Sequence, residues 1–142
     1  LFVHAGLSAR LLERDLEMDT LNARMSEGLY RTSKERREDP TLEFLYRSAG
    51  PVWYRGMVCT DEKYDPLTPE QTDALLRRYD ADRLLVGHTI FPDIPTFHDG
   101  RVIAVNVQNE LNRRKNRGRA VLIEGSRISV VGNRGVKRVL EE

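Results

Sequence analysis

Short apolar runs separated by polar stretches indicate a domain that mixes strands and helices. Residues 1–4 and 84–86 are compact apolar runs that each lead to a histidine near a glycine, which is typical of buried strands. Between them, apolar side chains at spacings of three and four predict a helix over residues 16–32. Residues 33–39 are a serine followed by charged residues only, and we expect a connector there. Residues 68–71, Thr-Pro-Glu-Gln, predict the start of another helix because they combine a capping threonine, an early proline and a glutamine that can close a capping box.

The carboxyl-terminal part of the chain follows a period of two instead. Residues 96–98 and 101–107 flank an Asp-Gly pair, and residues 119–124 and 127–131 flank a Gly-Ser pair. Alternating strands on either side of such turn residues predict two hairpins. A short helix is also expected from Pro40, with its apolar side chains packed against the body. Helices with interspersed strands, followed by hairpins, fit a layered α/β domain.

Composition excludes some kinds of partner and site but does not identify a function. The chain has 142 residues, enough for one domain, and 23 Lys plus Arg against 22 Asp plus Glu, so no global charge favours nucleic acid or an anionic membrane. The single cysteine, Cys59, excludes an internal disulfide and a multi-cysteine zinc site, and we expect it to be a small buried hydrophobe. No apolar run approaches the ~20 residues that span a bilayer, and we expect a cytoplasmic protein. Leu1 already lies in a predicted strand, so we expect that an earlier part of the protein precedes it.

Two histidines stand out because their settings match. His4 and His88 each follow an apolar strand, and open α/β sheets bind ligands at the carboxyl ends of their strands. If the two strands share a sheet with their ends aligned, both imidazoles converge on one place. A single histidine is more often structural than a ligand, but a converging pair favours a metal site, since neutral imidazole binds zinc, iron, copper and nickel. His98 precedes a hairpin turn, and we expect it to be exposed or supporting.

Four motifs together resemble one enzyme family. Residues 3–8, Val-His-Ala-Gly-Leu-Ser, resemble the His-Gly-Gly-Leu-Ser block of the calcineurin-like metallophosphoesterases, the phosphoprotein-phosphatase superfamily. Residues 86–89, Val-Gly-His-Thr, are similar to that family's Gly-His-Thr block. Residues 50–56 and 98–102 resemble segments of its Shewanella-like bacterial and plant branch. The order and spacing of these motifs agree along most of residues 1–107.

The resemblance implies a fold, a reaction and roles for three residues. The fold would be part of a four-layer α/β/β/α sandwich, and the complete protein would hydrolyse phosphate monoesters of phosphoserine, phosphothreonine or phosphotyrosine with two divalent metal ions, Mn, Fe or Zn. His4 and His88 match the two histidine ligands of the second metal, and Arg55 matches the arginine that binds the phosphate. A planar guanidinium suits that role because it offers paired donors and a permanent charge. Without the resemblance, Arg55 could equally be a surface arginine stacked on Trp53 or Tyr54.

The blocks that are absent matter as much. The family's Gly-Asp-x-His, Gly-Asp-x-x-Asp-Arg and Gly-Asn-His-Glu blocks precede the His4 block, and none occurs in the chain. Two departures also stand out: Ala5 replaces a frequent glycine, and Asn106 lies where many relatives carry aspartate. Two neutral imidazoles bring no negative charge, whereas paired divalent ions need carboxylates. We therefore expect residues 1–142 to be the carboxyl-terminal part of a single domain whose upstream half is absent, with no catalytic residue of its own.

That expectation extends to behaviour and partners. Alone, the chain should bind no metal pair and show little phosphatase activity. It should also leave an apolar sheet face and a strand edge uncovered, which the missing half or self-association would cover.

Two alternative functions stay open. Relatives of the same superfamily cleave dinucleoside polyphosphates, and no specificity pocket is predicted that excludes them. The basic run at residues 113–119 could instead make the chain a non-catalytic module that contacts phosphates. We favour a solvated loop between the two hairpins for this run, because no aromatic residue interrupts it, and we do not expect nucleic acid as a partner.

Overall fold

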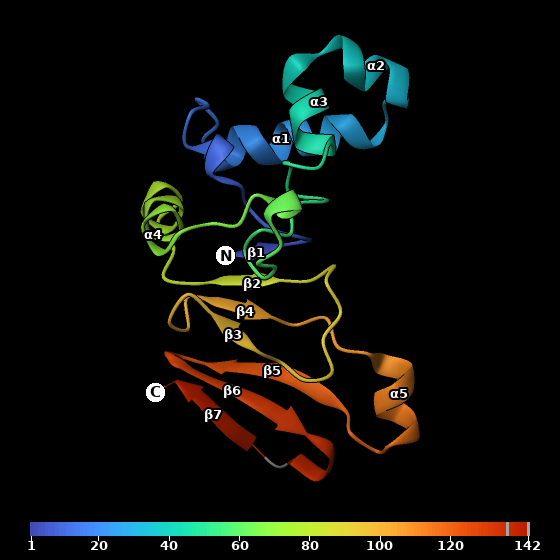
Figure 1. The fold of residues 1–142 in the computed structure, drawn as a ribbon, viewed down its shortest axis with the longest axis vertical. Helices are drawn as coiled ribbons and strands as arrows, with labels where there is room; N and C mark the ends of the chain where they lie inside the picture. The colour runs from blue at the N-terminus through green and yellow to red at the C-terminus, as the bar shows by residue number, and fades with distance from the viewer. Residues whose placement is uncertain (136, 142) are drawn as a thin grey trace.

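The computed structural model describes residues 1–135 and 137–141, which form two packed sheets with helices against one of them (Figure 1). The larger sheet is mixed: β1, β2 and β4 run parallel, and β3 runs antiparallel to β4. In spatial order its strands are β1 (Phe2–Val3), β2 (Leu84–Val86), β4 (Val102–Ala104) and β3 (Thr96–Phe97). The smaller sheet is an antiparallel meander of β5 (Arg119–Glu124), β6 (Arg127–Gly132) and β7 (Lys137–Glu141).

Alternation along β2 divides the buried side chains into two cores. Leu84 and Val86 face the helices, while Leu85 faces the smaller sheet and packs with Ile128 and Val130 of β6. Successive side chains of a strand point to opposite faces, so a central strand covered on both sides is apolar throughout. The layers are therefore helices, mixed sheet and antiparallel sheet. The predicted α/β class is confirmed, and the fourth layer of the expected sandwich stays a prediction.

Helices lie in more than one part of the molecule: those before residue 50 cluster at one end, and the last one lies near the smaller sheet (Figure 1). They are α1 (Met18–Leu29), α2 (Ser33–Glu38), α3 (Pro40–Tyr46), α4 (Pro69–Arg78) and α5 (Asn109–Arg114), with short 3₁₀ turns at Ala9–Leu11, Glu62–Tyr64 and Asn133–Gly135. The predicted capping box at α4 is confirmed: Thr68 Oγ1 accepts from the Gln71 N–H at 3.2 Å, and Gln71 Oε1 accepts from the Thr68 N–H at 2.9 Å. None of the helices in the described part of the chain has the length and apolar character needed to cross a membrane.

Two expectations about loops were wrong. The charged connector at residues 33–39 is largely helix α2, which begins at its own capping box between Thr32 and Glu35. The basic run at 113–119 is not a continuous loop, because its first two residues complete α5, where Arg114 donates to Glu110 one turn earlier at 2.6 Å. Both hairpins are confirmed, although β4 is shorter than the predicted residues 101–107.

The sheet keeps an open edge. β1 pairs with β2 alone among the described strands, and its Phe2 side chain is 72% exposed. An apolar side chain on an unpaired strand edge favours association with another segment or chain.

Candidate functional site

Parallel pairing of β1 and β2 brings the two distant histidines together. The register Val3↔Val86 aligns the strand ends, and the Gly87 N–H donates to the His4 carbonyl at 3.0 Å. His4 Nε2 then lies 3.1 Å from His88 Nδ1, and the ring centroids are 5.0 Å apart. The predicted convergence of the two imidazoles at the carboxyl edge of the sheet is thus confirmed. Their role as metal ligands stays a prediction.

The turn after β2 is conformationally unusual. His88 has φ of 58°, in the left-handed region that residues with a side chain seldom adopt. Such a conformation costs on the order of 1–3 kcal/mol and clusters at functional sites. Gly87 precedes it, where an added Cβ would lie 3.0 Å from the His4 carbonyl oxygen. The turn therefore depends on close approach of two backbones and delivers the His88 ring to the site.

Arg55 completes the cluster. Its Nη2 lies 2.9 Å from His88 Nε2. A guanidinium can only donate, so His88 Nε2 accepts, and the ring proton sits on Nδ1, from which it is donated to His4 Nε2. The pKa of His88 is lowered, first by burial and then by the nearby Arg55 and His4. The neutral imidazole that this arrangement requires is therefore also the form that the surroundings favour.

The loop that carries Arg55 is fixed at several points. The Ala5 N–H donates to the Pro51 carbonyl at 2.9 Å, which ties the loop to the residue after His4. The buried Tyr54 hydroxyl donates to the Asp65 carbonyl at 2.5 Å. Position 50 has room only for a glycine, because an added Cβ would lie 2.1 Å from the Leu45 carbonyl oxygen. These contacts hold Arg55 against the histidines.

Sequence alone left open that Arg55 stacks on Trp53 or Tyr54. Among the described residues, it stacks on neither. The ring that its guanidinium approaches is Tyr64, with Cζ 5.8 Å from the centroid. Trp53 instead sets its ring edge-on to His88, with centroids 5.2 Å apart and planes at 86°, and leaves 52% of its surface exposed. The sequence singled out this aromatic segment but did not predict the Trp53–His88 contact.

His98 supports the site without touching it. Its Nε2–H donates to the Met57 carbonyl at 3.1 Å, and its Nδ1 lies 3.2 Å from Thr72 Oγ1. It thus links the turn between β3 and β4 to α4 and to the loop that carries Arg55. The predicted supporting role of His98 agrees with these contacts. Cys59, expected to be a small buried hydrophobe, is partly buried and packs against the margin of the core.

The histidine pair fits part of a metal site. Nitrogen ligands lie at ~2.0–2.1 Å from zinc-like ions, so two that share an ion are about 3.0–3.4 Å apart, which matches the 3.1 Å between His4 Nε2 and His88 Nδ1. Within residues 1–135 and 137–141, no group of three or more His, Cys, Asp or Glu side chains could hold an ion. The described residues therefore bring two imidazole nitrogens together without a third His, Cys, Asp or Glu side chain beside them.

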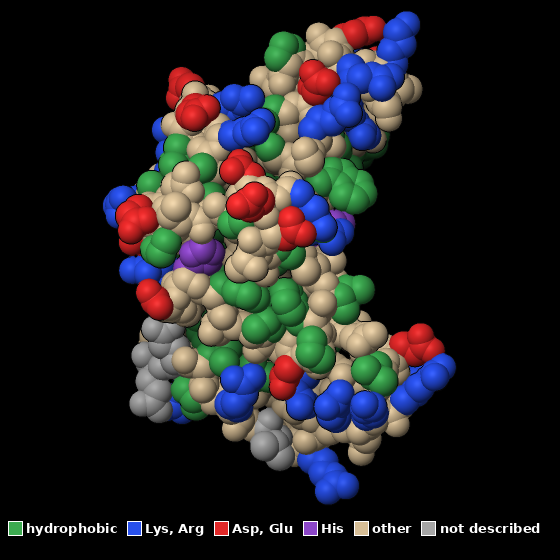
Figure 2. All heavy atoms as spheres, in the orientation of Figure 1, with side chains coloured by type: hydrophobic (Ala, Val, Ile, Leu, Met, Phe, Trp, Pro, Cys, Tyr) green, Lys and Arg blue, Asp and Glu red, His purple; other side chains and the backbone are tan. Residues whose placement is uncertain are grey.

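Two residues of the rival basic run are paired with acidic side chains. Arg119 donates to Asp93 at 2.9 Å, and Arg114 is paired with Glu110. On the face shown in Figure 2, Lys and Arg side chains gather around α5 and separately around α2, with no single stripe joining them.

Comparison with known proteins shows which fold the chain resembles. No protein-family profile and no curated protein sequence matches the chain. Three solved structures of cold-active protein tyrosine phosphatase, one of them from a psychrophilic Shewanella species, match with a TM-score of 0.85 and 26% identity. They cover 99% of this chain, which spans only 39–40% of theirs. The chain therefore has an α/β fold like that of part of these phosphatases.

Proposed function

We propose that these residues belong to a metal-dependent phosphatase of the calcineurin-like type that hydrolyses phosphate monoesters on proteins. The observation that carries the proposal is the contact of three groups, His4, His88 and Arg55, at the carboxyl ends of two parallel strands. The similar structures are described as protein tyrosine phosphatases, which favours phosphotyrosine among the phosphorylated side chains.

The three groups have separable tasks in this proposal. His4 Nε2 and His88 Nδ1 would ligate one of two divalent ions, Mn, Fe or Zn. When bound, such an ion pair supplies an activated water and neutralises charge on the phosphoryl oxygens. A ligating Nδ1 carries no proton, so the proton of neutral His88 would lie on Nε2, which could then no longer accept from Arg55. Arg55 would then be available to donate its paired N–H groups to the phosphate.

The architecture proposed for the complete protein follows from the missing carboxylates. Residues 1–142 form the carboxyl-terminal part of one four-layer domain, and the acidic ligands and the catalytic acid–base group lie in a part outside them. The open β1 edge with its exposed Phe2 supports this, because the other part would cover it. By itself this chain should hydrolyse little substrate. A second copy covering the same edge is the alternative.

A hydrolysis assay on the complete protein that contains residues 1–142 tests the proposal. Its substrates are a phosphotyrosine peptide, a phosphoserine peptide and a dinucleoside tetraphosphate. We expect phosphopeptide hydrolysis that a chelator abolishes and added Mn²⁺ restores, while residues 1–142 alone show little activity. Hydrolysis that survives complete metal removal would contradict the mechanism, and preferential cleavage of the dinucleoside tetraphosphate would contradict the substrate class.

A further inference from the structure

A hollow of about 830 Å³ opens beside Arg55. Arg55 and Trp53 each belong both to this hollow and to the histidine site, so the hollow continues directly from the place where the phosphate would bind. Its size is in the range of pockets that enclose a sizeable organic ligand, ~300–1,000 Å³. Its lining is otherwise made of Arg10, Tyr46, Arg47, Ser48, Ala49, Tyr54, Lys63, Tyr64 and Asp65.

The hollow is strongly cationic. Arg10, Arg47 and Lys63 line it in addition to Arg55, against the one acidic lining residue, Asp65. Arg47 is paired with Glu43 at 3.2 Å and Lys63 with Asp61 at 2.9 Å, but all four side chains are well exposed, at 61%, 42%, 62% and 52%. Exposed pairs of this kind contribute only ~0–1 kcal/mol, so an incoming anion can replace the partner. For Arg10, no ion pair occurs within the described part of the chain.

Aromatic side chains, among them Tyr46, Trp53 and Tyr64, also line the hollow. The Tyr64 ring lies near two cations, with Lys63 Nζ at 4.8 Å and Arg55 Cζ at 5.8 Å from its centroid. The half-exposed Trp53 stands at the border with His88. A wall of rings and cations suits a ligand that carries an apolar or aromatic group next to negative charge.

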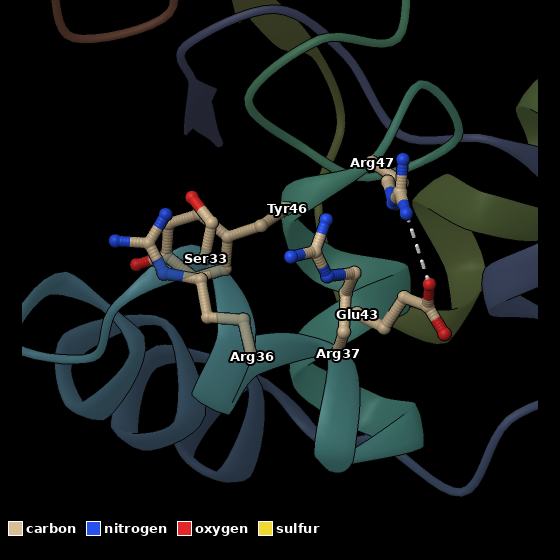
Figure 3. Close-up of a pocket in the computed structure, with 6 residues that line it drawn as sticks. All are labelled: Ser33, Arg36, Arg37, Glu43, Tyr46 and Arg47. Atoms are coloured by element: carbon tan, nitrogen blue, oxygen red, sulfur yellow. Dashed lines mark hydrogen bonds and ion pairs between the residues drawn. The ribbon is translucent and has the colours of Figure 1, made fainter.

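The cationic surface extends beyond this hollow. A second hollow of about 240 Å³ shares Tyr46 and Arg47 with it and is also lined by Ser33, Arg36, Arg37 and Glu43 (Figure 3). In it Arg36 stacks on the Tyr46 ring at 4.1 Å, and Arg47 reaches Glu43. Two adjoining hollows with arginine along both favour an extended anionic chain over a small compact anion.

We propose that the hollow beside Arg55 binds the polypeptide that flanks the phosphorylated residue, with Arg10 and Arg47 selecting substrates that carry acidic side chains there. This inference rests on the proposed phosphatase function and adds a substrate class to it. Arg10 and Arg47 are specificity residues in this account, since they lie outside the His4–His88–Arg55 cluster.

The test compares two phosphotyrosine peptides of equal length on the complete protein, one with Asp and Glu flanking residues and one with Asn and Gln. We expect kcat/KM to favour the acidic peptide about tenfold, as two exposed charge pairs provide, and the preference to shrink as ionic strength rises. In the double variant Arg10→Gln/Arg47→Gln the preference should disappear. The matched control is Arg114→Gln, which removes an arginine from another i,i+4 ion pair, on α5, and should keep the preference.

Each outcome separates the inference from the function on which it rests. Hydrolysis of both peptides at equal rates, or an acidic preference that persists in the double variant, would overturn the inference and leave the phosphatase intact. Failure of the wild-type protein to hydrolyse either peptide or p-nitrophenyl phosphate would overturn the proposed function. A dinucleoside tetraphosphate cleaved faster than both peptides would assign the hollow to a nucleotide instead.

Discussion

Replacing Arg55 by alanine is expected to lower kcat/KM of the complete protein for phosphopeptides by about 10²–10³-fold, the usual loss when a donor to transition-state oxygens is removed. Arg55→Lys should recover only part of this, because lysine keeps the charge but not the paired donors. His88→Ala should lower activity by more than about 100-fold and reduce the bound metal, since even the loss of a group that orients a metal ligand costs roughly 10–100-fold.

Steady-state kinetics and metal content of purified variants check this prediction. Arg114→Ala is the control, because Arg114 lies on α5 in an exposed ion pair. Circular dichroism of each variant shows whether the fold is kept. If Arg55→Ala and His88→Ala both turn over substrate at the wild-type rate, the site lies elsewhere in the protein.

The second large effect concerns the strand that delivers His88. Leu84 in β2 is fully buried, at 0% exposure, in the core between the sheet and the helices. Leu84→Ala should lower the free energy of unfolding by about 2–5 kcal/mol, because it removes apolar contacts and leaves a cavity. Leu29→Ala is the matched control: Leu29 is 67% exposed at the end of α1, and its change should stay within about 0.5 kcal/mol.

Urea denaturation followed by tryptophan fluorescence measures both variants, and Trp53 is the only tryptophan in the chain. The denaturant slope should be unchanged if the native and unfolded states stay alike. A loss below about 1 kcal/mol for Leu84→Ala would mean that this face of β2 is not a packed core.

Local patterns predicted the elements that position the site. These patterns involve only residues that are close together in the sequence. The structure contains all of them: the two apolar runs, the capping box at Thr68 and both hairpin turns. The convergence of His4 and His88 was predictable too, because parallel strands of one sheet align their carboxyl ends. Helix α2 was missed because it lacks an apolar stripe, although Thr32 and Glu35 at capping-box spacing were a usable signal.

Contacts that depend on tertiary placement could not be predicted in the same way. The approach of Arg55 to His88 needs the loop at residues 50–56 to fold back on β1, which no periodicity encodes. The cationic hollow combines Arg10, Arg47 and Lys63 from separate segments, and each reads in the sequence as an ordinary surface charge. The family resemblance predicted a phosphate-binding role for Arg55. Which atoms donate and which accept between Arg55, His88 and His4 could be assigned only from the structure.

The account depends most on one ion shared by two imidazoles and on Arg55 leaving His88 when that ion binds. Crystals of the complete protein grown with Mn²⁺ and orthovanadate, measured at the manganese absorption edge, test both points. We predict an anomalous peak within bonding distance of His4 Nε2 and His88 Nδ1, with the Arg55 guanidinium on the vanadate oxygens. A peak that lies away from both nitrogens, or an Arg55 that still contacts His88 Nε2 in the metal-bound protein, would contradict it.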